Sequence, residues 1–415
     1  MKTSFVDIAF QKLIALRSSI LLPLAIAFFL LIAVANESRA FFAGYLISGV
    51  FIIWTYQKSQ PRKICICLMT VLLLASSTIL FFIKHDSSEG RILIYKISYQ
   101  IWREHFWSGI GWGRFGIVYL SYQSEYFRIS HYTPKELLLA DNTQYAFNDF
   151  SQLVIMTGIG GIIGLMLACA SYVILVFKVL QRSRNLIIDI VLLQTGCILI
   201  AACLTHVFES PTFQVFFLGN ILILLAYIFP YRRGYISILF FLSLVGMMLY
   251  HYGWTVTHLN AINRFSMAKR LRQAGYLTEA VTELRKLYPE MKPEPEFLAE
   301  YAKTLSAYGE YREAAAILNS LITVKAGYGY YDQLGHNLEE LHEWKSAEIA
   351  YRQATLMVPN RFLPRYHLFL LYLRLHQQSR AKFIGTEILT LPVKIPSPAV
   401  QHIKLSVKKA LENGR

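Results

Sequence analysis

The sequence predicts an all-α protein: a polytopic transmembrane helix bundle of about seven spans with a helical loop region, then a tetratricopeptide-like α-solenoid. Three observations predict this. Hydrophobic residues make up 55% of the 415 residues and charged residues only 16%, whereas soluble proteins carry about a quarter charged residues. Apolar runs close to the roughly 20 residues that cross a bilayer recur up to residue 252. Beyond residue 254, amphipathic segments recur with a constant period.

The first part, residues 1–252, is predicted to be the transmembrane domain. A span needs about 20 apolar residues, and seven segments approach that length. They are Ser18–Ala35, Ala40–Tyr56, Ile64–Ile83, Ser151–Phe177, Leu186–Thr205, Thr212–Phe229 and Tyr235–Tyr252. The fourth contains Gly160 and Gly164, whose spacing is typical of close helix packing. A large loop, residues 84–150, separates the third segment from the fourth.

Basic residues in the short connections predict the orientation, because cytoplasmic loops are enriched in Lys and Arg. Clusters precede the first span and follow the second, fourth and sixth, which puts all of them on one side. The loop 84–150, the turn His206–Pro211 and the C-terminal part then face outward, on the periplasmic side of a bacterial inner membrane. A cleaved signal peptide ending near Ala35 is an alternative interpretation of the first span that leaves the remaining topology unchanged.

The positions of the cysteines and the net charge argue against a disulfide framework and against a nucleic-acid partner. All five cysteines lie in predicted spans, so no disulfide framework is expected outside, and their small size suits helix packing. The net charge is +15. On an outward-facing protein this favours an anionic membrane surface or glycolipid over nucleic acid, which is not expected as a partner.

The C-terminal part, residues 255–415, contains a repeat. The segments GYLTEA, GEYREA, HEWKSA and HQQSRA end at Ala280, Ala314, Ala347 and Ala381. Their spacing matches the tetratricopeptide period of roughly 34 residues. Such repeats stack because none buries its apolar face alone. The array either binds a protein partner or acts as a passive spacer, because a fold does not specify a ligand.

The loop between the third and fourth segments holds the candidate chemistry. Residues 90–107 predict a helix with an aromatic face (Ile92, Tyr95, Tyr99, Trp102, Phe106) suited to the headgroup layer. The glycine-rich segment Ser108–Gly116 contains a literal dinucleotide fingerprint, but no preceding strand supports that interpretation. A turn or a close backbone approach to a headgroup is expected instead.

Four motifs in order carry a family resemblance. SRAFFAG (Ser38–Gly44), EGRILIYK (Glu89–Lys96), SGIGWGRF (Ser108–Phe115) and DNTQYAFNDFSQLVIMTGIGG (Asp141–Gly161) resemble the O-antigen ligase and polymerase superfamily, which includes protein O-oligosaccharyltransferases. The resemblance covers about residues 38–230. It implies inverting transfer of a glycan from undecaprenyl diphosphate to the hydroxyl of a lipid or protein acceptor. It implies no cofactor, neither metal nor nucleotide.

The resemblance also implies site residues. Arg39 and Arg91 match family arginines, and a guanidinium group binds phosphate oxygens bidentately, so both are expected to bind the diphosphate. An arginine that only reaches the membrane interface is the alternative for each. Asp141 and Asp149 are expected as catalytic residues that orient or deprotonate the acceptor. Asn142, Tyr145 and Asn148 are expected to bind substrate, and no metal ligands are expected.

Two departures from the family pattern leave an alternative open. The usual histidine before the Asn-Asp pair is Phe147 here, with Asp141, Asp149 and the distant His131 as substitutes. His206 and Glu209 lie in the last outward turn, where interfacial solvation is the expected role and a position facing the site is the alternative. Only three spans precede the loop, fewer than is typical of the family. A non-catalytic or truncated membrane-anchored scaffold for envelope partners is therefore the alternative, and a polymerase acting on a second lipid-linked glycan is a close variant.

Overall fold

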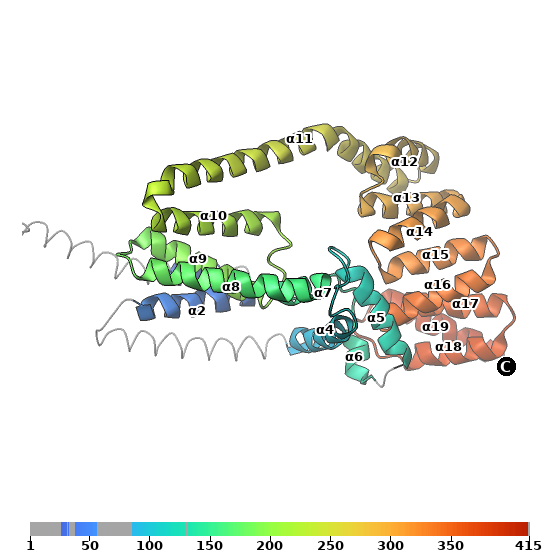
Figure 1. Ribbon diagram of the computed structural model, residues 1–415. Coiled ribbons are helices and arrows are strands. Elements are labelled where there is room, and N and C mark those ends of the chain that lie inside the picture. Colours follow the sequence, from blue (N-terminus) through green and yellow to red (C-terminus); the bar gives the residue numbers. More distant parts are fainter. Residues whose placement is uncertain (1–25, 31, 33–37, 56–84, 130–131, 414–415) are drawn as a thin grey trace, which may run out of the picture. The chain divides into compact units, whose positions relative to one another are not determined.

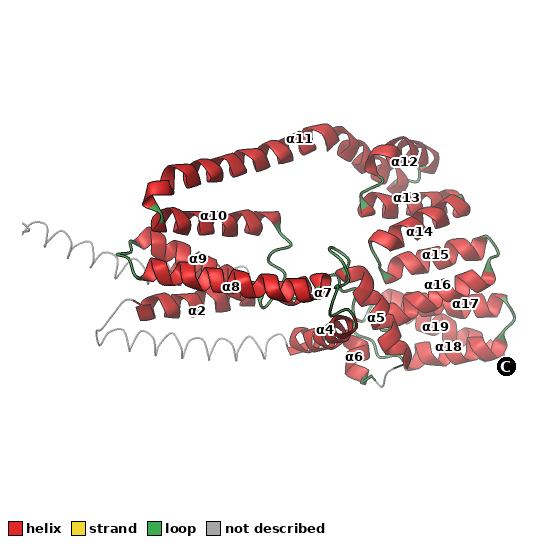
Figure 2. Ribbon diagram, in the orientation of Figure 1, coloured by secondary structure: helices red, strands yellow, loops and turns green. Residues whose placement is uncertain are grey.

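A computed structural model describes residues 26–30, 32, 38–55, 85–129 and 132–413. Within these ranges the regular structure is entirely helical, with eighteen helices of which one is a 3-10 helix (Figure 2). The chain divides into two compact units. The apolar unit comprises Met1–Ser88, Phe106–Gly109 and Tyr145–Leu249, and the repeat unit comprises Glu89–His105, Ile110–Gln144 and Tyr250–Arg415.

The predicted domain boundaries divided the chain differently. They placed the whole loop 84–150 with the apolar helices, whereas most of this loop groups with the repeats in the structure. The physical reason is that helices in the loop bury their apolar faces within the repeat unit.

The apolar unit is built from described helices on either side of residues 85–144. These are α2 (Arg39–Thr55), α7 (Asp149–Thr157), α8 (Ile159–Leu180), α9 (Leu186–Ala202), α10 (Pro211–Ile228), the 3-10 helix η1 (Pro230–Arg232) and the first part of α11 (Arg233–Gln273). Helix α11 continues into the repeat unit. Asn185 starts α9 by accepting a hydrogen bond from the backbone N–H of Ile188 at 3.0 Å, which satisfies a donor that the helix leaves unpaired.

Helices α2 and α9 pack closely because small residues face one another. A methyl group added at Gly44 would lie 2.7 Å from the carbonyl oxygen of Cys197, and one at Gly196 would lie 2.7 Å from Oγ of Ser48. Small residues allow helix backbones to approach in this way in membranes. The prediction that the cysteines serve helix packing therefore fits Cys197, which is fully buried at this crossing.

Two of the described helices are long and apolar enough to cross a bilayer, α8 and α10. Helices α2 and α9 are apolar but have 17 residues each. At the usual helical rise this is about 25 Å, slightly less than a hydrocarbon core of about 30 Å. The first and third predicted segments lie largely outside the described residues. Among the residues that the structure describes, there are thus two candidate spans where the sequence predicted seven.

The fourth predicted span, Ser151–Phe177, is interrupted in the structure. Gly158 has a φ of 63° and separates α7 from α8. A methyl group at Gly158 would lie 2.6 Å from the backbone nitrogen of Gly109, and one at Gly109 would lie 2.3 Å from the carbonyl oxygen of Met156. The close approach expected of the glycine-rich segment is therefore to this helix break.

The repeat unit contains the loop helices and the C-terminal array. Its helices are α4 (His85–Glu104), α5 (Phe115–Ile129), α6 (Pro134–Leu139), the end of α11, α12 (Leu277–Met291), α13 (Pro295–Tyr308), α14 (Tyr311–Val324), α15 (Tyr328–Glu340), α16 (Trp344–Met357), α17 (Phe362–Arg374), α18 (Gln378–Thr390) and α19 (Pro398–Asn413). In Figure 1 the helices from α12 onward stack as successive antiparallel pairs.

The predicted repeat is visible in both packing and backbone. The four alanines that define its period, Ala280, Ala314, Ala347 and Ala381, are 0–1% exposed. In each repeat the turn before the second helix contains a left-handed residue. These are Gly275, Gly309, His342 and His376, with φ between 57° and 98° and the same spacing as the alanines. Each second helix therefore starts from the same turn and buries its alanine against the first helix.

Helix α4 confirms the predicted helix in the loop. It buries Leu93, Ile97 and Ile101, whereas Ile92 and Tyr99 on the opposite face are 65% and 61% exposed. An exposed aromatic and aliphatic face on an amphipathic helix suits the membrane interface.

Candidate functional site

The Asn148-Asp149 pair of the fourth motif lies at the start of α7. Oδ1 of Asn148 accepts a hydrogen bond from the backbone N–H of Ser151 at 2.9 Å and so caps the helix. Asp149 is the first residue of α7, where a negative charge is favoured by the helix dipole. The motif Asn-Asp is thus explained locally by helix capping, and its side chains are held at a defined helix end.

The turn between α9 and α10 meets this helix end. A carboxylate oxygen of Asp149 accepts a hydrogen bond from the backbone N–H of Phe208 at 2.9 Å. Residues 205–210 form this turn, and the backbone of Val207 contributes a second hydrogen bond to the same carboxyl. The Asp149 carboxylate therefore links the fourth motif to a residue 59 positions further along the chain.

This contact brings His206 beside Tyr145 and Phe147 of the fourth motif. The rings of His206 and Tyr145 are stacked, with centroids 4.6 Å apart and an interplanar angle of 10°. The ring of Phe147 meets His206 edge-on, with centroids 5.3 Å apart at 83°. Nδ1 of His206 lies 3.4 Å from Oγ1 of Thr205. The imidazole is half-buried in an aromatic setting that fixes its plane.

A second polar connection fixes the same turn. Gln152 in α7 is 5% exposed and its Nε2 donates to Oε1 of Glu209 at 2.6 Å. Its Oε1 accepts from the backbone N–H of Ala146 at 2.9 Å. A buried side-chain amide whose NH2 group and carbonyl oxygen both form hydrogen bonds holds its neighbours in one arrangement. Gln152 thus holds Ala146, between Tyr145 and Phe147, against the turn that carries His206.

The environment raises the pKa of Asp149 above the usual range of an aspartate. Burial is the largest cause, because it disfavours the charged form, and the nearby carboxylate of Glu209 adds to it. The backbone hydrogen bonds from Phe208 and Val207 and the proximity of His206 oppose the rise in pKa without cancelling it. A carboxylate with a raised pKa is a stronger base than an exposed one.

The first motif lies against the same turn. Ala40 and Phe41, which follow Arg39 in α2, pack against the buried cluster that contains Ile198 and Val207, as do Phe150 and Phe208. The ring of Phe41 stacks on Phe213 with centroids 5.1 Å apart. Arg39 is half-buried and begins α2. The fold therefore brings residues next to Arg39 and residues next to Asp149 into one apolar cluster.

Three predicted site residues lie in the repeat unit instead. Arg91 is half-buried in α4, where its charge acts on the hydroxyl of Tyr95. Asp141 and Asn142 follow α6, and Oδ1 of Asp141 lies 3.1 Å from the guanidinium of Arg361. The same Oδ1 accepts from the backbone N–H of Asn142 at 2.8 Å. The other four, Arg39, Tyr145, Asn148 and Asp149, are in the apolar unit.

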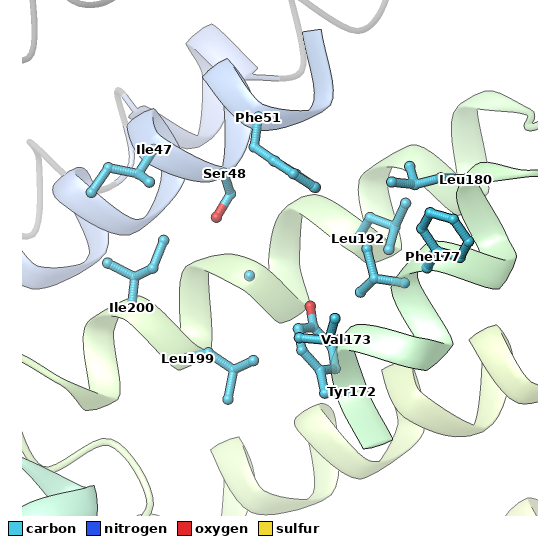
Figure 3. A pocket seen from close by; sticks show the side chains of 12 residues that line it. Ile47, Ser48, Phe51, Tyr172, Val173, Phe177, Leu180, Leu192, Leu199 and Ile200 are labelled. Carbon is cyan, nitrogen blue, oxygen red and sulfur yellow. The ribbon is translucent and has the colours of Figure 1, made fainter. Parts of the chain in front are cut away.

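An apolar groove lies between α2, α8 and α9 and has a volume of about 540 Å³. Figure 3 shows Ile47 and Phe51 of α2 facing residues of α8 and α9 across this space. The hydroxyls of Ser48 and Tyr172 are the polar side-chain groups in its lining. The groove suits a hydrocarbon chain.

Residues 24–167 match the family model described as O-Antigen ligase. The chain contains an O-antigen ligase domain. No curated protein matches the chain. All seven predicted site residues fall inside the O-antigen ligase domain, whereas His206 and Glu209 lie beyond its matched end.

Two solved structures are similar to part of the chain. "MamA 41-end from Desulfovibrio magneticus RS-1" is 17% identical, with 34% of this chain and 75% of that chain covered and a TM-score of 0.30. The "MamA RS-1 ArsTM double mutant" is 13% identical, with 37% of this chain and 97% of that chain covered and a TM-score of 0.20. The repeat architecture rests on the helices and turns described above.

The sequence assigned His206 to interfacial solvation and did not single out Gln152. A polar residue inside the apolar run of the fourth motif was the available signal for Gln152. For His206 the signal was a histidine in a short outward turn beside the O-antigen ligase domain. Neither signal specified a partner, because the contacts between α7 and this turn join residues far apart in the sequence.

Proposed function

We propose that the chain is a membrane-bound glycosyltransferase of the O-antigen ligase type. It moves a glycan from undecaprenyl diphosphate to an acceptor hydroxyl on the outer face of the inner membrane. The observation that carries this proposal is the group formed by His206, Tyr145, Phe147 and Asp149. Here an imidazole and a carboxyl group of raised pKa lie beside the motif from which the family histidine is missing.

The proposed chemistry is a single displacement with inversion. The acceptor oxygen bonds to the anomeric carbon while the bond from that carbon to the diphosphate oxygen breaks. The proton of the acceptor hydroxyl passes to His206, whose ring plane is fixed by Tyr145. Asp149 orients the acceptor, and its carboxylate favours the imidazolium that forms. A positioned base of this kind typically contributes about 10²–10⁴-fold in rate.

The leaving diphosphate needs positive charge, because its negative charge increases as the bond breaks. Arg39 and Arg91 are proposed for this role, since a guanidinium forms paired hydrogen bonds with phosphate oxygens. Asn148 and Tyr145 are proposed to bind the transferred sugar and the acceptor. Asn142 is proposed to bind substrate and Asp141 to anchor its segment through Arg361.

The apolar groove is proposed to hold the prenyl chain. Its lining is almost entirely hydrocarbon, which matches a polyprenyl chain and offers little to a polar ligand. We further propose seven spans within residues 1–252, with the N-terminus in the cytoplasm and residues 255–415 outside. In this orientation α2, α7 and the turn at His206 have their site residues at the outer membrane edge, where a lipid-linked glycan is presented.

Deleting the gene and measuring the host's own lipid-linked glycans tests the proposal. Undecaprenyl diphosphate-linked glycan should accumulate, and the glycosylated acceptor should be lost, as measured by mass spectrometry of extracted lipids and surface material. The wild-type gene should restore both, and a gene encoding Asp149→Asn should not. An unchanged lipid-linked pool would refute the enzyme and favour a membrane-anchored repeat scaffold, for which Phe147 in place of histidine is the supporting observation.

A further inference from the structure

The loop of this protein is bound by its own repeats. Helix α5 packs against α16 and α14, which are the second helices of two successive repeats. Its inward face, including Tyr119, Leu120 and Gln123, is 0% exposed. Oγ of Ser124 accepts a hydrogen bond from Nε2 of Gln353 in α16 at 3.0 Å. A 15-residue helix with such a buried face is stabilised by this packing rather than by its own hydrogen bonds.

The turn between α16 and α17 holds the end of α6. Asn360 is 6% exposed, and its Nδ2 lies 2.6 Å from the carbonyl oxygen of Ala140 and 2.8 Å from that of Leu138. The carbonyl oxygen of Leu137 is 3.3 Å away. The last carbonyls of a helix have no partner within the helix. The buried side-chain amide of Asn360, which lies 220 positions after Ala140, donates hydrogen bonds to these carbonyls.

Gln123 forms a second buried connection. Its Nε2 donates to the carbonyl oxygen of Asp141 at 3.0 Å and also to that of Met357, the last residue of α16. The guanidinium of Arg361 reaches the Asp141 carboxylate, as described above. Asn360 and Arg361, in the turn that follows α16, thus hold the segment after α6. Gln123 holds it as well, because the same amide group also binds the end of α16.

The preceding inter-repeat turn holds the next residues. Nε2 of Gln144 donates to the carbonyl oxygen of Ala326 at 3.3 Å. A methyl group added at Gly327 would lie 3.3 Å from Nδ2 of Asn142. Equivalent turns of two neighbouring repeats therefore contact the segment Asp141–Gln144.

We propose that this face of the repeat array is a clamp whose ligand is formed by Phe115–Ile129 and Tyr132–Gln144 of the same chain, with Asn360 as its main positioning residue. The clamp recognises main-chain carbonyl groups through buried amides, and such groups are costly to leave unpaired. It fixes the residues that lead directly into Tyr145–Asp149. A protein partner for this face of the repeats would compete with the loop.

Hydrogen exchange on the full-length protein in nanodiscs tests the clamp. The informative amides are those of Ala140, which donates to Glu136, and Thr143, which donates to Asp141. Asn360→Ala should speed exchange across residues 134–144 on the order of tenfold, the factor expected for losing a buried amide hydrogen bond. Asn360→Asp should speed it further, because it places a carboxylate against carbonyl oxygens. Asn319→Ala, at an exposed position of α14, is the matched control and should change nothing.

Two outcomes would overturn the proposal. Exchange of residues 134–144 at the wild-type rate in both Asn360 variants would mean that the repeats do not hold the segment. A rise of equal size across α12–α14 would mean that Asn360 serves only the folding of the array. The measurement does not use glycan transfer, so its failure and a failure of the proposed enzyme are separate results.

Discussion

Gly109 and Gly113 offer a pair of substitutions that separates two physical effects within one motif. Both glycines have positive φ, 67° and 73°. A methyl group at Gly109 would lie 2.3 Å from the carbonyl oxygen of Met156, whereas one at Gly113 would meet nothing within 4 Å. Alanine is therefore forced into an unfavourable backbone conformation at both positions, and it collides with α7 only at Gly109.

The expected magnitudes follow from these two geometries. Holding alanine in a left-handed conformation costs roughly 1–2 kcal/mol, and this should be the whole effect of Gly113→Ala. Gly109→Ala adds the cost of forcing a group into a packed space, about 1–3 kcal/mol. The difference corresponds to roughly 5- to 150-fold in an opening equilibrium, since about 1.4 kcal/mol is tenfold.

Hydrogen exchange of α7 amides measures this difference. The backbone N–H of Gly158 donates to the carbonyl oxygen of Val154 at 2.8 Å and reports on the end of α7. Gly109→Ala should speed its exchange roughly 5- to 150-fold more than Gly113→Ala does. Equal rates in the two variants would refute the packing of the glycine-rich segment against the helix break.

Two further predictions concern the site and the groove. Because the pKa of Asp149 is raised by burial, the acid limb of kcat/KM should lie above the usual range of an aspartate. Asp149→Asn should lower the rate and shift that limb, and an unchanged pH profile would exclude Asp149. The protonated form is the one that burial favours. Asp149 therefore stabilises the fold fully at pH values below its pKa in the unfolded chain. This stabilisation is lost as the pH rises through its pKa in the folded protein. Val173→Trp, which fills the groove from α8, should raise the KM for the lipid-linked donor. Met166→Trp, at a similarly exposed position of α8 outside the groove lining, is its control, and equal KM values would argue against a prenyl chain there.

The repeats were predictable because each of their signals is local. An alanine at the helix crossing and a turn just before it recur in the sequence, and the structure repeats both with the same spacing. The amphipathic face of α4 was predictable for the same reason, since its period lies within one helix. Such patterns require no knowledge of which distant residues meet.

The site and the clamp depend on contacts that no local pattern contains. His206 meets Tyr145 and Phe147 only because the turn after α9 folds back on α7. Asn360 reaches the end of α6 from 220 positions away. The break at Gly158 was hidden because glycine within an apolar run suits helix packing as well as a break. Gly160 and Gly164, predicted for packing, face open space among the described residues.

The most direct test of the central claim exchanges the histidine between its two neighbouring positions. His206→Gln should lower transfer from the native lipid-linked glycan in isolated membranes about 10²–10⁴-fold, and His402→Gln, at an exposed position of α19, should not. Phe147→His in the His206→Gln protein should recover part of the activity. The two rings are 5.3 Å apart, and histidine tolerates the φ of 53° at this position better than phenylalanine. Wild-type transfer by His206→Gln would contradict the assignment of the imidazole as the base.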